Sequence, residues 1–559
     1  SFDGTISSTN AALNFGTAGA VTLTGNTTFS SGTGAITLFD LAAANFNLVL
    51  QGSGADVLGI VNLGTGTLNL AGKTGGSVTV NGLLTAGALT TIGNGYAIAL
   101  NAGGTVSGAV ATTLSNTGTV TLGNDAADVL AFEAGLIATA PTTRNLAGTI
   151  SALDAAALIN LGGANAINVT ANTTLGGAAT GAITLGAAVV LPDAVTLILG
   201  AGAASAVSTQ AISGTAAGAV SNLTINSTAL VTIGGAVGTD IGTVTVTNSG
   251  GTSFSGAVTA TTVTLTNTTG TVTFTGALNA TTLNTAANGY NVTLNGGGTV
   301  TAAVAFTNTG SLTIDPSGFT FTGGASKITG AKSFAGTISS TNAALNFGTA
   351  GAVTLTGNTT FSSGTGAITL FDVTAVNFNL VLQGSGADVL AAVSLGTGTL
   401  NLTGKTGGSV TASTTRSTSP GPWLCSASAT RKACTWAIKI AAGTPLSVTS
   451  PTMMPRRLSS RRRMSKKSPP TLRAGSRQAP KSYPSTTGSP AGRIAIWISC
   501  ASCSSRSSFS RRSGRTRPRS APAFSSSPGG PPAPPTCGSR MAGWRSAPPP
   551  TCGARSCGR

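Results

Sequence analysis

The acidic side chains with the clearest catalytic potential lie together at Asp125, Asp128 and Glu133. Paired carboxylates can cleave polysaccharides when one acts as general acid and the other as base or nucleophile. Acids this close together are also typical of a solvated corner between strands, and we favour that interpretation. We therefore expect no catalytic residues. The sequence contains no His, which excludes triads with His as the base and zinc sites with His ligands.

Two glycine-rich stretches come close to nucleotide-binding motifs without matching them. In GTLNLAGKT, residues 66–74, five residues separate Gly66 from Gly72, where a phosphate-binding loop requires four. The TLNL within it also reads as a strand. GAGAAS at residues 200–205 is half of a dinucleotide-binding fingerprint and lacks the helix that must follow it. We expect no cofactor and no metal ligands.

Two further patterns point to structure rather than chemistry. Asp56 and Asp388 occupy equivalent positions in GSGADVL, which favours a structural role, such as capping a turn through an Asx hydrogen bond. Thr-x-Thr triplets recur at 243–245, 262–264 and 271–273. Flat Thr arrays can bind ice, but β-branched Thr is also what a water-facing strand prefers, and the triplets do not persist in every repeat. We interpret them as outward strand positions.

The composition divides sharply at residue 411. Residues 1–411 hold 5 Lys and Arg and all 12 Asp and Glu, a net charge of −7, whereas residues 412–559 hold 25 Lys and Arg and no acid. All seven Cys and all four Trp lie after residue 411. The basic overall charge is therefore no evidence that the larger part binds nucleic acid.

Internal repeats organise the larger part. Residues 1–79 and 333–411 match at 71 of 79 positions. A shorter period also recurs, since SFSGAVTATTV begins at Ser253 and TFTGALNATTL begins at Thr273. Runs such as AVTL, AITL and TLNL alternate apolar and polar residues, which is the pattern of short strands with one buried face.

These features predict an all-β parallel solenoid with rungs of about 20 residues, one rung for each turn of the chain. Apolar side chains stack inside, Thr and Asn face water, and Gly and Asn form the corners. An antiparallel sandwich also uses short strands but does not explain the close repetition. The longest apolar stretch is interrupted by Pro192 and Asp193, so we expect no transmembrane segment.

The segments SNTGTVTLGN at Ser115, TNTTGTVTFTG at Thr266 and TNTGSLTI at Thr307, set in Gly-, Ala-, Thr- and Asn-rich repeats, resemble large bacterial exoproteins. These are the filamentous-haemagglutinin-like and autotransporter passenger proteins. The resemblance covers residues 1–411 and implies a right-handed parallel β-helix. It also implies secretion through an outer-membrane pore of a Gram-negative bacterium, and adhesion or biofilm formation at the cell surface. Because the sequence starts within a repeat, we interpret it as a fragment.

Residues 412–559 form a basic, Ser-, Arg- and Pro-rich tail. The abrupt end of the near-duplication, with scattered Cys and Trp, is typical of a repeat gene translated out of frame. On this interpretation the tail is disordered, because it lacks the apolar patterning of a core. A genuine basic arm that binds phosphates remains an alternative, since MPRRLSSRRRMSKK is a strongly basic run. CASC at residues 500–503 is only half of a zinc site.

We expect a structural and adhesive exoprotein without catalysis, whose partners are glycans or proteins of host or neighbouring cells. Two alternatives stay open. A carbohydrate-active β-helix enzyme would place clustered carboxylates on one face of adjacent rungs. A nucleic-acid-binding protein would act through a genuinely encoded tail.

Overall fold

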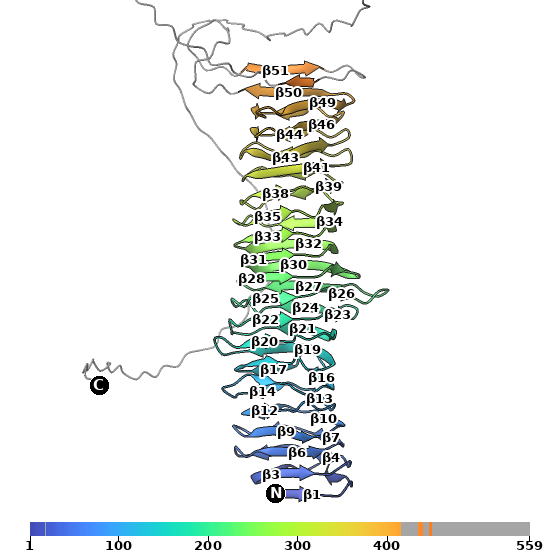
Figure 1. The fold of residues 1–559 in the computed structure, drawn as a ribbon, viewed down its shortest axis with the longest axis vertical. Helices are drawn as coiled ribbons and strands as arrows, with labels where there is room; N and C mark the ends of the chain where they lie inside the picture. Colours follow the sequence, from blue (N-terminus) through green and yellow to red (C-terminus); the bar gives the residue numbers. More distant parts are fainter. Residues whose placement is uncertain (17, 415–433, 440–446, 450–559) are drawn as a thin grey trace, which may run out of the picture. The chain divides into compact units, whose positions relative to one another are not determined.

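The computed structural model describes residues 1–16, 18–414, 434–439 and 447–449. Residues 1–414 form an all-β parallel solenoid of about 20 turns with rungs of about 21 residues, which confirms the predicted fold class. The rungs are stacked one on another from β1 (Phe2–Ser7) to β50 (Ser409–Thr414) (Figure 1).

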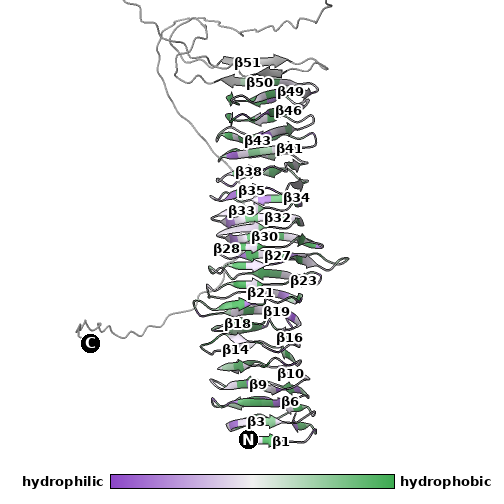
Figure 2. Cartoon of the chain, viewed as in Figure 1, coloured by the Kyte–Doolittle hydropathy of each residue, from purple (hydrophilic) through white to green (hydrophobic). Residues whose placement is uncertain are grey.

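Alternation of side chains builds the core. In β3 (Val21–Ser30), with the sequence VTLTGNTTFS, Val21, Leu23 and Phe29 are buried, while Thr22 and Thr24 are exposed. Figure 2 shows apolar residues, in green, in strands along the whole stack. Each buried Leu, Val or Phe contributes on the order of 2 kcal/mol relative to exposure, and stacking joins these contributions into one continuous core.

The rungs are roughly triangular, so their strands form three columns that run along the stack. Long strands turn a corner and belong to two columns. Column A is joined throughout by parallel hydrogen bonding. Its strands are β2 (Leu13–Phe15), β4 (Ile36–Leu38), β7 (Ala55–Leu58), β10 (Ser77–Val80), β13 (Ala97–Leu100), β16 (Thr119–Leu122), β19 (Thr143–Ala152), β21 (Ile167–Leu175), β23 (Val189–Leu191), β26 (Ile212–Gly214), β29 (Val237–Gly238), β32 (Val258–Thr268), β34 (Leu278–Thr285), β36 (Gly298–Val300), β39 (Phe319–Phe321), β41 (Lys332–Ser339), β43 (Val353–Ser362), β46 (Leu380–Gly384) and β49 (Thr399–Lys405).

Column B begins with the second halves of β1 and β3 and later includes the first halves of β41 and β43. Its strands are β1 (Phe2–Ser7), β3 (Val21–Ser30), β6 (Leu48–Gly52), β9 (Thr67–Lys73), β12 (Ala88–Thr90), β15 (Thr112–Thr113), β18 (Gly135–Ile137), β20 (Leu158–Asn160), β22 (Ile183–Leu185), β25 (Val207–Thr209), β28 (Leu230–Ile233), β31 (Gly251–Phe254), β33 (Thr271–Phe274), β35 (Asn291–Leu294), β38 (Leu312–Ile314), β45 (Val373–Ala375) and β48 (Val393–Ser394).

Column C takes the first halves of β1 and β3 and the second halves of β19, β21, β32 and β34. Its other strands are β5 (Leu41–Ala43), β8 (Val61–Asn62), β11 (Leu84–Ala86), β14 (Gly104–Val106), β17 (Val129–Phe132), β24 (Thr196–Leu199), β27 (Ser221–Asn226), β30 (Ile241–Ser249), β37 (Val304–Ala305), β40 (Ala325–Ser326), β42 (Leu345–Phe347), β44 (Ile368–Leu370), β47 (Asp388–Leu390) and β50 (Ser409–Thr414). Beyond it, β51 (Cys434–Lys439) pairs antiparallel with β50, and β52 (Ser447–Thr449) with β49.

The corners use the residues that the sequence predicted. Asn45 has φ 66° and Asn377 has φ 67°, a left-handed conformation that Asn tolerates. The Oδ1 atom of Asn45 accepts a hydrogen bond from the N–H of Thr65, one rung further along, at 2.9 Å. Asn377 does the same with Thr397 at 3.0 Å. The corner side chains therefore hold successive rungs in register.

Candidate functional site

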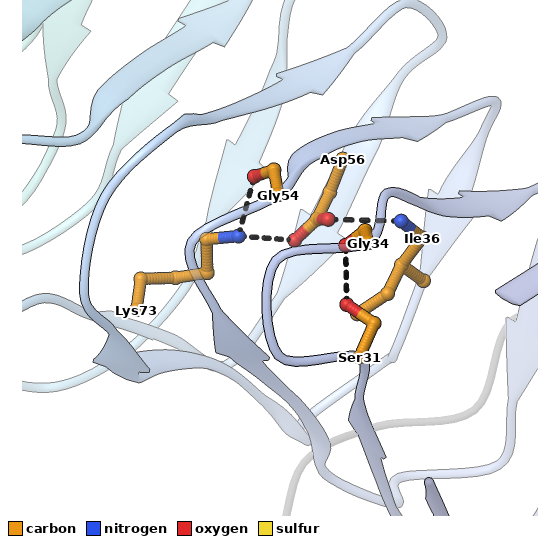
Figure 3. A network of polar contacts seen from close by, with 6 residues as sticks. All are labelled: Ser31, Gly34, Ile36, Gly54, Asp56 and Lys73. Atoms are coloured by element: carbon orange, nitrogen blue, oxygen red, sulfur yellow. Dashed lines mark hydrogen bonds and ion pairs between the residues drawn. The ribbon is translucent and has the colours of Figure 1, made fainter. Parts of the chain in front are cut away.

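A buried ion pair lies inside the solenoid at Asp56 and Lys73 (Figure 3). The Nζ of Lys73 donates to Oδ2 of Asp56 at 2.7 Å and to the carbonyl oxygen of Gly54 at 2.8 Å. The other carboxylate oxygen accepts from the N–H of Ile36 at 3.0 Å. Both charged side chains are fully buried. Burial raises the pKa of Asp56, whereas the Lys73 ammonium and the Ile36 N–H act in the opposite direction.

The duplicated segment repeats this pair atom for atom. Lys405 donates to Oδ2 of Asp388 at 2.7 Å and to the carbonyl oxygen of Gly386 at 2.9 Å. The N–H of Ile368 donates to Oδ1 of Asp388 at 2.9 Å. Burial again raises the pKa of the acid against the effect of its lysine. Each carboxylate thereby links three rungs, and neither pair is accessible to a ligand in solution.

The prediction that Asp56 and Asp388 cap a turn through an Asx hydrogen bond is wrong. Both residues lie on strands, and their carboxylates bond to an N–H twenty residues earlier and to a lysine seventeen residues later. The predicted structural role itself agrees with these contacts. The lysines belong to the GTLNLAGKT-type stretches, which form β9 and β49 rather than a phosphate-binding loop.

Two members of the acidic cluster, Asp125 and Asp128, lie at the corner between β16 and β17. The Oδ2 atom of Asp128 accepts from the N–H of Asn124 at 2.8 Å and from that of Asp125 at 2.9 Å. Oδ1 of Asp125 accepts from the N–H of Ala127 at 2.9 Å. Glu133 lies after β17, and its backbone pairs with Val106. Two of the three carboxylates therefore cap the backbone of their own turn, as the solvated-corner interpretation predicts.

Three more cations are buried, and the sequence analysis did not identify them. Arg144 donates to the carbonyl oxygens of Ala138 and Asn165 at 2.7 and 2.8 Å, and burial lowers its pKa.

The other two buried cations are lysines. Lys332 donates to the carbonyl oxygens of residues 350 and 351 at 2.6 and 3.0 Å. Lys327 donates to the carbonyl oxygen of Asn308. Burial, and secondarily the neighbouring charge of Lys332, lower the pKa of Lys327 to about 8.

These interior groups carry a weak sequence signal. The parallel between RNLAGTIS at Arg144 and KSFAGTIS at Lys332 marks one cation at the start of each strand. Nothing in the local pattern says that the charge points inward. Among the described residues, no group of His, Cys, Asp and Glu has the arrangement needed to hold a metal ion.

The most extended surface feature is a column of small polar side chains on the outward side of column B. Direct parallel pairing places one such residue in each of twelve successive rungs. We call this set the hydroxyl column. Its members are Asn160, Thr184, Ser208, Thr232, Ser253, Thr273, Thr293, Thr313, Ser333, Thr354, Thr374 and Ser394.

The hydroxyl column has a regular geometry. Neighbouring parallel strands lie ~4.8 Å apart, so the column presents one hydrogen-bonding group at roughly that spacing along the axis. All members are partly or fully exposed, and none is charged. The column can thus form many weak, neutral hydrogen bonds with an extended ligand.

The predicted Thr triplets are divided between two faces. Thr243 and Thr262 are paired neighbours on β30 and β32, in column C. Thr273 lies on β33 and belongs to the hydroxyl column. The triplets alone therefore did not reveal the longest polar array. The spacing of 20 to 24 residues between polar residues at the centre of successive strands is the signal that could have found it.

The comparisons with known proteins add no relative to this description. No family model matches the chain, no curated protein matches it, and no solved structure matches it. Within the part of the chain that the structure describes, no helix is long and apolar enough to cross a membrane. The basic runs and CASC of the tail lie outside the described residues.

Proposed function

We propose that this protein is a structural and adhesive part of a secreted bacterial surface protein, which attaches cells to neighbouring surfaces without catalysis. The hydroxyl column is the single observation that carries this proposal. A solenoid that places one neutral Ser, Thr or Asn side chain in each of twelve rungs offers a long surface to a long ligand. Glycans of host or neighbouring cells fit this chemistry, because they are rich in hydroxyl groups and repeat along their length.

Multivalency explains how such a surface could bind firmly. A single neutral hydrogen bond contributes only about 1 kcal/mol. Linked contacts act together, because each one raises the effective concentration for the next. The resemblance to filamentous-haemagglutinin-like proteins and autotransporter passengers supports the same function and suggests export through an outer-membrane pore.

The test measures binding of the full chain to an immobilised panel of neutral glycans. Thr273→Lys with Thr313→Lys interrupts the hydroxyl column at two rungs. Thr259→Lys with Thr299→Lys is the matched control, because these residues face outward from column A in the same two rungs. We expect at least tenfold weaker binding for the first pair and no more than twofold for the second.

Other outcomes would contradict the proposal. Equal losses in both pairs would mean that the hydroxyl column is not the binding surface. Release of sugars from the panel, abolished by Asp128→Asn, would favour a carbohydrate-active enzyme. Binding to nucleic acid that falls steeply with salt would favour an arm in residues 412–559.

A further inference from the structure

The near-duplication is out of phase with the turns of the solenoid. The first copy contains β2 and β4, and the second contains their equivalents β42 and β44, with the same sequences LNF and ITL. β2 and β4 begin column A, but β42 and β44 lie in column C. The equivalents therefore do not lie above one another.

Column A makes the shift certain, because its strands are hydrogen bonded without a gap from β2 to β49. It begins with β2 and β4, yet it ends with β46 and β49. These are the equivalents of β6 and β9, which lie in column B. In Figure 1 the labels β4, β7, β10, β46 and β49 stay on one side of the stack. Each segment of the second copy has thus moved by one face.

The same shift applies to exposed residues. Thr22 and Thr24 of β3 face outward from column C, followed in the next rungs by Ala42 and Asn62. Their equivalents, Thr354 and Thr356, face outward from column B, where Thr354 continues the hydroxyl column. We name the two surfaces the first patch (Thr22, Thr24 and Asn26) and the second patch (Thr354, Thr356 and Asn358).

We infer that the two patches bind the same neutral glycan ligand on two different faces of the solenoid, so that one chain can bridge two separate surfaces. This inference rests on the proposed function. The patches are identical in sequence and exposure pattern, apart from their neighbours in adjacent rungs. At ~4.8 Å per rung and about 21 residues per rung, they lie roughly 75 Å apart along the axis.

The two possible placements differ in avidity. Two patches on one face would engage a single flat surface together, and losing one would weaken binding by a factor of about 10² or more. Patches on different faces engage a flat surface one at a time. Losing the first patch then removes bridging but leaves binding to a flat surface nearly unchanged, because the hydroxyl column on the other face still binds.

The binding experiment uses the full chain on flat neutral-glycan films and on two populations of beads with the same glycan. We expect Thr22→Lys with Thr24→Lys to bind films within about twofold of the unchanged chain and to lose bead bridging. Loss of film binding by a factor of 10² or more, or bridging that persists, would overturn the inference. The control, Thr259→Lys with Thr299→Lys, should bridge beads normally.

A second measurement separates this inference from the proposed function. The exposed loops at residues 9–12 and 341–344 both read TNAA and lie at different corners. A Fab against this loop should bind twice, and electron micrographs should show the two Fabs about a third of a turn apart around the axis. Two Fabs on one side would overturn the face shift. If the Fabs lie at the expected positions but the chain binds no glycan, the face shift is confirmed. The proposed function and the bridging role are then both rejected.

Discussion

Buried lysines of this solenoid fall into two kinds with different partners. Lys73 and Lys405 meet a carboxylate, whereas Lys327 and Lys332 meet only carbonyl oxygens among the contacts described here. A paired charge loses little when its geometry is complete, but an unpaired one carries the full cost of desolvation. The two kinds should therefore respond differently to mutation and to pH.

Replacing Asp56 by Asn should loosen the rungs around it. The amide can still accept from Ile36, but the Lys73 ammonium loses its counter-charge in the interior, at a cost of about 3–5 kcal/mol. Hydrogen exchange of β4, β7 and β10 should become faster. Asp125→Asn is the control, because its exposed side chain still accepts from Ala127. Unchanged hydrogen exchange in the Asp56 variant would mean that the ion pair does not hold the neighbouring rungs together.

Lys327 should make stability rise with pH on the alkaline side. Its folded pKa of about 8 lies below the ordinary 10.5, so the unfolded chain holds more protons between these values. The free energy of unfolding should increase from about pH 8 to about pH 10.5, by an order of 3 kcal/mol at most. Below about pH 8 Lys327 is charged in both the folded and the unfolded chain, so it lowers the free energy of unfolding by a constant amount.

Lys327→Met tests this dependence by removing the titrating group. We expect a higher thermal midpoint than the unchanged protein at pH 7, and a difference that shrinks as the pH approaches 10.5. Lys332, the nearest titrating neighbour, is present in both proteins. Midpoints that move in parallel across this range would show that Lys327 is not the source of the effect.

Residue roles could be predicted only in part. Equivalent positions in two copies correctly indicated that Asp56 is structural, because a repeated site is more typical of a scaffold than of a single active centre. The partner was missed, since Lys73 lies seventeen residues away and only the rung length brings it back to Asp56. Inward cations such as Arg144 occupy strand positions where the alternation rule expects an apolar residue, and no sequence pattern indicated that they are buried.

At the scale of elements, stacking distance controls which corner residues can change. Gly298 has φ 125°, and a Cβ atom there would overlap the carbonyl oxygen of Leu278 in the preceding rung. Gly104 of the related segment repeats this arrangement against Leu84. Gly289, nine residues before Gly298, would meet no atom within 4 Å. Close approach of backbones, rather than the turn alone, requires these glycines.

Gly298→Ala and Gly289→Ala form a matched pair. The first should separate β34 from β36 and speed hydrogen exchange in both strands, because the added methyl group and the positive φ are both unfavourable. The second should change exchange little. Similar effects of the two substitutions would contradict the stacking distance described here.

Strands and their inward faces were predictable because alternation and short period are local properties. Val, Leu and Phe of β3 and β33 point inward as the pattern predicted. Membership of a column was not predictable. It depends on the summed length of every corner between two strands, and one additional segment moves all later strands to another face.

At the scale of the whole solenoid, this dependence decides what the duplication does. Two nearly identical segments carry the same core into different columns, so the interior is conserved between the copies while the outward residues change direction. The hydroxyl column is continuous because each successive rung contributes one polar residue at the same register position of its strand. Both surface features follow from parallel register.

The most direct test of that register is cross-linking between neighbouring rungs. With the seven native Cys replaced by Ser, Thr273→Cys and Thr293→Cys should be joined rapidly by oxidation or by a short bifunctional thiol reagent, because parallel pairing sets these residues directly side by side. Thr273→Cys with Thr299→Cys, on different faces, should remain separate. Failure of the first pair to cross-link, or equal cross-linking of both pairs, would contradict the parallel solenoid and the hydroxyl column with it.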